Sequence, residues 1–151
     1  MKKVLIVEDE ILARLGLRQL VDWRKLELEL LPDATDGEEA LKMIRNSCPD
    51  IILLDLNIPK VSGLEILEFL KKEEMPTKVI VVSCQEEFDV VKKAMKLGAY
   101  DYLRKLNLSS DELENILEKC LVETEERNTV HMQGIREIRY EEIVRDSRDI
   151  L

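Results

Sequence analysis

The 151-residue chain is poor in aromatic residues and in cysteines. Phe, Trp and Tyr together make up 4% of it, so a hydrophobic core has to be built from Leu, Ile, Val, Ala and Met. The three cysteines, Cys48, Cys84 and Cys120, lie far apart and form no C-x-x-C pair. This spacing indicates neither a disulfide framework nor a zinc site. We therefore expect a protein of the reducing cytoplasm.

The sequence also lacks a long apolar run. At the N-terminus, "MKKVLIVEDE" reaches acidic residues after only four apolar ones, which is too short for the apolar region of a signal peptide. Nowhere does an apolar run approach the roughly 18 residues that a membrane-spanning helix needs. A net charge of -9 argues further against binding to nucleic acid or to an anionic membrane. We expect this chain to contact neither directly.

The chain alternates between short strand-like and longer helix-like stretches. Apolar runs typical of buried parallel strands are separated by segments with helical periodicity. The expected strands are Lys3–Val7, Leu28–Ala34, Asp50–Leu54, Lys78–Ser83 and Asp101–Lys105. The second is placed at a sheet edge, because Pro32 cannot donate a hydrogen bond to a neighbouring strand. This order predicts an α/β fold, a doubly wound (βα)5 parallel sheet covered by helices on both faces.

Capping residues mark where several of the helices begin or end. Asp36, with Glu39 three residues later, has the pattern of a capping box, and Ser109 with Glu112 repeats it. Gly98 is placed to end the preceding helix.

The pattern of strands and helices covers residues 1–121, which we expect to form one domain. Residues 122–151 differ, because their charges are dense and their apolar residues are irregularly spaced. That spacing is too irregular for a coiled coil and leaves open a continued helix, a linker or a fragment of something larger. We predict a charged, partly helical tail or linker that leads toward an output domain.

Polar residues stand where four of the expected strands end. Glu8 and Asp9 follow the first strand, Asp55 follows the third, and Ser83 and Lys105 end the fourth and fifth. Taken alone, a strand-end acid is most often only a turn residue. In an open parallel sheet, however, ligands sit beyond the carboxyl ends of the strands, where all of these groups meet. Their coincidence at one edge therefore indicates a site.

The chemistry of this edge favours a divalent metal ion. Neighbouring carboxylates repel each other unless a cation lies among them, and hard oxygen ligands suit Mg2+. We expect Asp9 and Asp55 as carboxylate ligands, Glu8 close by through water, and the backbone carbonyl of Asn57. With the ammonium of Lys105 nearby as well, Asp55 is equipped to be a nucleophile that becomes an aspartyl phosphate.

Four motifs resemble those of receiver domains of two-component response regulators, in the family's order and spacing. They are "LIVEDE", "LLDLNIPKVSG", "VVS" and "AYDYLRK". The resemblance covers residues 1 to about 121 and implies a flavodoxin-like sheet with strand order 2-1-3-4-5. The run from Val82 to Lys105 further resembles receivers attached to AraC-type DNA-binding domains.

The resemblance assigns a role to each residue of the site. It implies that Asp55 accepts a phosphoryl group from a histidine kinase, that Glu8, Asp9, Asp55 and the Asn57 carbonyl hold Mg2+, and that Lys105 contacts the phosphoryl group.

The resemblance also implies a switch and an output. Ser83 and Tyr102 form the switch pair, and a homodimer through the fourth helix, fifth strand and fifth helix is the expected response. The output is transcription, through the chain's own or a separate output domain. A stand-alone single-domain regulator that acts through protein contacts is the alternative.

Three other functions fit the sequence less well. A phosphatase of the haloacid dehalogenase class also forms an aspartyl phosphate, but its second acid, a general acid, is replaced here by Asn57. A nucleotide-binding domain needs a glycine-rich loop where Glu8 and Asp9 would repel phosphate. A degenerate receiver would have lost some of the site residues. We therefore expect a signalling phosphoacceptor that promotes its own phosphorylation and dephosphorylation, rather than an enzyme.

Two positions depart from the family pattern. Cys84 follows Ser83 where the family usually keeps Ala or another small residue, and we interpret it as a packing residue. The second departure is after the lysine, where the family usually has proline joined through a cis bond. Here Leu106 follows Lys105, and a cis bond before a residue other than proline costs about 2.5 to 4 kcal/mol. We expect a trans bond, with Leu106 packed inward and Lys105 held less firmly toward Asp55.

Overall fold

The computed structural model describes residues 1–84 and 87–123. Its strands are β1 (Lys2–Val7), β2 (Leu28–Leu30), β3 (Ile51–Leu54), β4 (Lys78–Ser83) and β5 (Asp101–Arg104). Its helices include α1 (Ile11–Leu20), α2 (Gly37–Ser47), α3 (Gly63–Lys72) and α4 (Phe88–Lys96), and residues 110–123 are also helical. Residues 1–114 form one compact unit. The predicted tail lies almost entirely in residues 124–151, outside the described residues.

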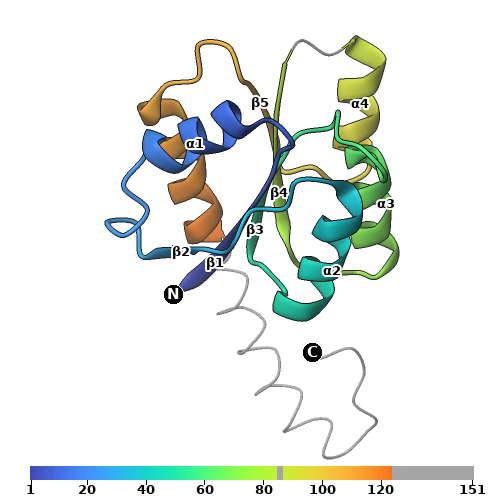
Figure 1. Cartoon of the computed structure of the whole chain (residues 1–151), viewed down its shortest axis with the longest axis horizontal. Coiled ribbons are helices and arrows are strands. Elements are labelled where there is room, and N and C mark those ends of the chain that lie inside the picture. Colours follow the sequence, from blue (N-terminus) through green and yellow to red (C-terminus); the bar gives the residue numbers. More distant parts are fainter. Residues whose placement is uncertain (85–86, 124–151) are drawn as a thin grey trace, which may run out of the picture. The chain divides into compact units, whose positions relative to one another are not determined.

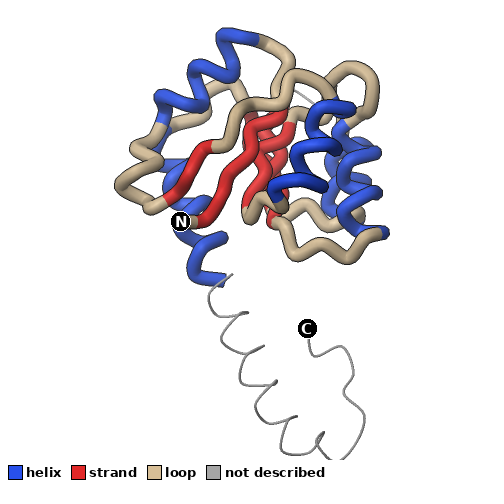
Figure 2. Tube along the Cα trace, turned by 60° about the horizontal axis from the view of Figure 1, so that its bottom comes forward, coloured by secondary structure: helices blue, strands red, loops and turns tan. Residues whose placement is uncertain are grey.

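The sheet has the predicted topology. Its five strands pair in the order β2-β1-β3-β4-β5, and every pairing is parallel. In Figure 1, α1 covers one face of the sheet, and α2, α3 and α4 cover the other. Figure 2 shows the strands side by side between these two layers of helix. The expectation of a doubly wound, flavodoxin-like α/β fold is confirmed.

The central strands are buried on both faces, as a parallel sheet between two layers of helix requires. Every residue of β3, and Val4–Val7 of β1, is buried. On one face they pack with apolar residues of α2 and α3, including Ile44, Ile66 and Leu67. These residues recur at helical spacing, so each helix turns one apolar face to the sheet.

Strand β2 is shorter than the sequence indicated. Only Leu28–Leu30 pairs along β1, whereas Ala34 makes an isolated bridge to Val7. Pro32, which has no N–H group, lies between these two contacts. The strand is at the edge of the sheet, as expected.

The predicted helix caps are present, and one was missed. Asp36 accepts a hydrogen bond from the Glu39 N–H at 2.8 Å, and Ser109 accepts one from the Glu112 N–H at 3.1 Å. Gly98 has φ +102°, a conformation that glycine adopts without strain. The missed capping box, Ser62 with Glu65, begins α3 and so fixes the end of the loop that follows β3. Among the described residues, no helix is long and apolar enough to cross a membrane.

Candidate functional site

The candidate site lies beyond the carboxyl ends of β1, β3, β4 and β5. Val7 pairs with Leu54, so Glu8 and Asp55 leave two neighbouring strands at the same level. Carboxylate oxygens of Glu8, Asp9 and Asp55 all lie within 4.8 Å of one another. Glu8 is 1% exposed and Asp55 5% exposed, whereas Asp9 is open to solvent. The sheet therefore gathers three acids, two of them buried, around one point.

Both carboxylate oxygens of Asp55 are held by hydrogen bonds. Oδ2 accepts one from Lys105 Nζ at 2.8 Å. Oδ1 accepts one from Ser83 Oγ at 3.0 Å and another from the Asn57 N–H at 3.0 Å. These donors come from β4, from the β5 end and from the loop after β3, so three segments fix the orientation of this carboxylate.

Lys105 supplies a positive charge to two buried acids. Its ammonium forms ion pairs with Asp55 Oδ2 and with Glu8 Oε1. Burial by itself lowers the pKa of Lys105, but the hydrogen bonds to Asp55 and Glu8 and their charges outweigh it and raise the pKa. Its backbone N–H donates to the Ser83 carbonyl at 2.9 Å, which anchors the residue to β4. Lys105 is therefore a fixed cation at neutral pH.

Glu8 is a carboxylate with little access to water. Burial raises the pKa of the Glu8 carboxyl above its usual value, and the nearby charge of Asp55 adds to this. Hydrogen bonds from Lys105 and from the Glu10 N–H oppose the rise. A buried carboxylate is costly unless a cation compensates it. With three acids and one ammonium, the site still carries an excess of negative charge.

This excess charge, together with the chemistry of the donors, fits a hard divalent cation. All three side chains offer carboxylate oxygens, and the exposed Asp9 leaves room for the waters that Mg2+ retains. The donor set contains no sulfur or imidazole, the ligands that favour zinc or copper.

Ser83 and Tyr102, the predicted switch pair, lie on neighbouring strands. Ser83 is fully buried and points to Asp55, and the Tyr102 hydroxyl donates to the Cys84 carbonyl at 2.9 Å. The backbone of Cys84, the residue after Ser83, is thus hydrogen-bonded to the Tyr102 side chain of β5.

Of the three expectations for Lys105 and the residue after it, the structure confirms only the trans peptide bond. No peptide bond in the described residues is cis, so the predicted trans Lys105–Leu106 bond is confirmed. The prediction that Leu106 packs inward is wrong, because this residue is 72% exposed. The chain turns at Asn107, which has φ +66°, and this turn leaves Leu106 outside. Nor is Lys105 displaced from Asp55.

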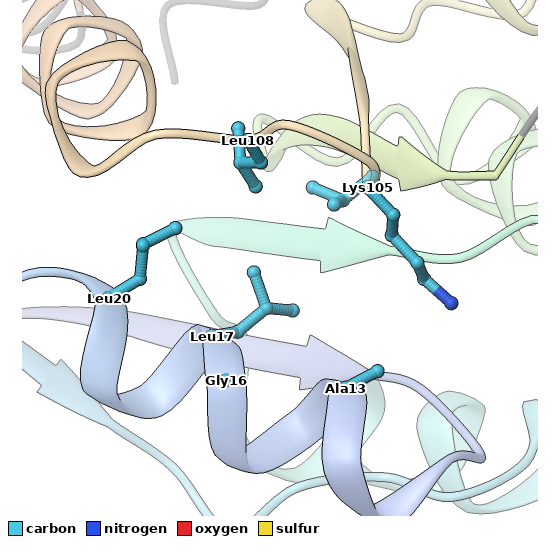
Figure 3. A pocket seen from close by; sticks show the side chains of 7 residues that line it. Ala13, Gly16, Leu17, Leu20, Lys105 and Leu108 are labelled. Atoms are coloured by element: carbon cyan, nitrogen blue, oxygen red, sulfur yellow. The ribbon is translucent and has the colours of Figure 1, made fainter.

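A separate apolar pocket of about 240 Å³ lies between α1 and the loop after β5. It is lined by Ala13, Gly16, Leu17, Leu20, Val82, Lys105 and Leu108. In Figure 3 the Lys105 stem borders this pocket, and its nitrogen points away from Leu20 and Leu108. No sequence pattern predicted this pocket, because it depends on how α1 and the loop after β5, which are distant in the chain, meet.

Comparisons with known proteins agree with this geometry. Residues 4–118 match the response regulator receiver domain family. The chain is 40% identical over 117 residues to the positive alginate biosynthesis regulatory protein of Pseudomonas aeruginosa, covering 78% of the chain and 46% of that protein. It is 34% identical over 103 residues to the transcriptional regulatory protein DegU of Brevibacillus brevis, covering 68% and 43%.

A solved structure shows the same fold. The receiver domain of AraT, a response regulator from Geobacillus stearothermophilus, superposes with a TM-score of 0.76 at 30% identity, covering 84% of this chain and 98% of that one. The chain spans about half the length of the curated relatives that it matches. It belongs to the response regulator receiver domain family, whose members are signalling phosphoacceptors rather than classical enzymes.

Proposed function

We propose that Asp55 accepts a phosphoryl group from a histidine kinase in a Mg2+-dependent reaction. An Asp55 carboxylate oxygen forms a bond to phosphorus as the bond from phosphorus to the donor's imidazole nitrogen breaks, and the nitrogen keeps the electron pair. The observation that carries this proposal is the position of Asp55, buried beside two acids with Lys105 at 2.8 Å and Ser83 at 3.0 Å.

The residues around Asp55 would bind Mg2+ and stabilise the charge of the phosphoryl group. Asp9 and Asp55 would ligate Mg2+ directly, Glu8 would bind it through water, and the Asn57 carbonyl would complete the protein's share. The bound ion supplies positive charge to the phosphoryl oxygens during transfer. Lys105 would contribute a second positive charge, and the Ser83 hydroxyl, which donates to Asp55 Oδ1, would donate to a phosphoryl oxygen.

An exposed apolar stripe supports a protein as the phosphoryl donor. Ile11, Leu12 and Leu15 of α1 are 63%, 82% and 48% exposed and directly follow the acidic loop after β1. A donor that brings its histidine to Asp55 must cover this edge of the sheet, where burial of the three side chains would stabilise the complex.

Phosphorylation would control an output through the Ser83 and Tyr102 pair. A movement of Ser83 toward the phosphoryl group and an inward turn of Tyr102 would repack the surface of α4, β5 and the helix at residues 110–123, favouring a symmetric homodimer. Residues 1–121 would form the receiver in the cytoplasm, and residues 122–151 would lead to the output.

The partial coverage of its relatives supports a longer natural protein. We favour a DNA-binding output domain of the AraC type, because of the family resemblance of the β4–β5 region. The name of DegU, a transcriptional regulatory protein, supports only the coarser expectation that the output is transcription. Under the alternative, the chain is a stand-alone regulator. Reading the gene downstream of Leu151 decides between these outputs.

A direct test uses a small phosphodonor. The protein is incubated with acetyl phosphate and Mg2+, and its intact mass is measured; a gain of one phosphate is expected. The same incubation with a chelator in place of Mg2+ should leave the mass unchanged. A protein that gains no phosphate with Mg2+ present is a binding module only, and the proposal is then wrong.

A further inference from the structure

The segment that leads into α2 and includes its first residue, residues 34–37, carries none of the proposed site residues but forms hydrogen bonds with both acidic loops. The Glu8 N–H donates to the Ala34 carbonyl at 3.0 Å. Three residues later, the Gly37 N–H donates to the Pro59 carbonyl at 3.0 Å, in the loop that begins with Asp55. The segment therefore connects the loop that carries Glu8 and Asp9 to the loop that carries Asp55 and Asn57.

Gly37 is needed for close approach rather than for conformation. It is the first residue of α2, where any residue can adopt the backbone angles, and its φ is not positive. A Cβ atom at this position would lie 1.9 Å from the Val61 carbonyl oxygen and 2.5 Å from Val61 Cβ. The clash is with backbone, which cannot rotate away. Only glycine lets α2 lie directly against the loop.

The same loop is fixed from its other side. The Gly63 N–H donates to the Leu56 carbonyl at 3.0 Å, and a Cβ on Gly63 would lie 2.6 Å from Leu56 Cα. Leu56 and Ile58 are buried, with 4% and 8% of their surface exposed. The loop is therefore held between α3 and residues 34–37. Because it is packed on both sides, a displacement of the Val61 backbone should also displace Asn57.

Two ion pairs also join this loop to the start of α2. Lys60, at φ +73°, pairs with Asp36 Oδ2 at 3.5 Å and Glu38 Oε2 at 3.8 Å. The lysine side chain is 58% exposed, so these pairs contribute little to stability. They do orient the left-handed residue of the loop toward the start of α2.

We propose that residues 34–37 form a brace that sets the spacing between the two acidic loops, with Gly37 as a positioning residue for the metal site. The inference rests on the proposed Mg2+ site. A side chain at position 37 pushes Val61 and Pro59 away from α2, and the displacement carries Asn57 and the Asp55 carboxylate out of register with Glu8 and Asp9.

The test adds one methyl group at two glycines. Gly37→Ala places it against Val61, whereas Gly16→Ala, in the middle of α1, places it where no atom lies within 4 Å. Mg2+ binding is measured by calorimetry without a phosphodonor. We expect Gly37→Ala to raise the half-saturating Mg2+ concentration roughly tenfold, the effect typical of losing support behind a metal ligand. Gly16→Ala should bind Mg2+ like the unchanged protein.

Thermal unfolding without Mg2+ separates positioning from simple destabilisation. If Gly37→Ala unfolds at a lower temperature yet binds Mg2+ as tightly as the unchanged protein, the brace proposal is wrong. If the unchanged protein itself fails to bind Mg2+, the proposed metal site is wrong, and the brace proposal, which depends on that site, is wrong as well.

A measurement on the unchanged protein covers the case in which Gly37→Ala does not fold. In an NMR titration with Mg2+, the amide signal of Gly37 should shift with the same concentration dependence as that of Asn57, although Gly37 is not a ligand. The Gly16 amide signal should stay in place. A Gly37 signal that does not respond to saturating Mg2+ would overturn the proposal.

Discussion

The ammonium nitrogen of Lys105 lies 2.8 Å from Asp55 Oδ2, reaching from the end of β5 across β4 to the end of β3. The same nitrogen pairs with Glu8 at the end of β1. One cation thus neutralises part of the charge of two buried acids on two different strands. Its removal should have consequences for stability as well as for phosphorylation.

Lys105→Met should destabilise the metal-free protein at neutral pH by about 3 kcal/mol, since Glu8 and Asp55 lose their counter-charge. The sign of the pH dependence follows from Glu8, whose pKa is already raised by burial. An acid with a raised folded-state pKa favours folding when protonated and opposes it as pH rises through that pKa. The deficit should therefore be largest near neutral pH and shrink as the solution is acidified.

Urea unfolding across this pH range, with and without Mg2+, measures the effect. Millimolar Mg2+ should restore part of the lost stability, because it replaces the missing positive charge. Lys42→Met, an exposed lysine on α2, is the control and should show neither the pH dependence nor the Mg2+ rescue. An equal deficit at all pH values would contradict the ion-pair explanation.

The sequence predicted the fold and the gathering of polar groups, because both depend on local signals. Apolar runs mark buried strands, and a parallel sheet brings residues such as Asp55 and Ser83 to one edge. The approach of Gly37 to Val61 was not predictable, since it depends on how the start of α2 packs against a loop more than 20 residues later in the chain. The exposure of Leu106 was missed as well, because the turn at Asn107 decides it and asparagine only permits such a turn.

Asp55→Asn should abolish phosphorylation by acetyl phosphate and leave the fold intact. The amide is a poor nucleophile, whereas Lys105 keeps Glu8 as an ionic partner. Intact mass with Mg2+ and circular dichroism measure the two effects. Glu68→Gln, an exposed acid of α3, should still gain one phosphate. A phosphate on the Asp55→Asn protein would place the acceptor elsewhere.

Beryllofluoride, which mimics an aspartyl phosphate, should increase the dimer fraction. The expected interface is the face of α4, β5 and the helix at residues 110–123. Sedimentation velocity at tens of micromolar protein, roughly the range of weak domain contacts, measures the shift. A sedimentation coefficient that does not change on addition of beryllofluoride and Mg2+ would show that this chain does not couple the site to dimerisation.

Ser83→Ala should separate phosphorylation from the response. Ser83 is fully buried and donates to Asp55 Oδ1, but it supplies no charge, so the variant should still gain a phosphate. Without the hydroxyl, the phosphoryl group loses the hydrogen bond from Ser83 at the end of β4, and the dimer fraction with beryllofluoride should fall toward that of the untreated protein. Ser47→Ala, at the end of α2, should dimerise normally. Equal dimerisation of both variants would remove Ser83 from the switch.

Leu106→Ala tests whether the residue after the lysine matters through its side chain or only through the backbone. The Leu106 side chain is 72% exposed, and the Lys105 ammonium already contacts Asp55 across a trans bond. Truncating an exposed side chain typically changes stability by less than about 0.5 kcal/mol. Both the urea midpoint and the rate of phosphorylation by acetyl phosphate should therefore stay close to those of the unchanged protein. Lys105→Ala, the matched truncation one residue earlier, should slow phosphorylation sharply because it removes the charge. A comparable loss of rate in Leu106→Ala would mean that the leucine helps to hold Lys105 in place, contrary to its exposure.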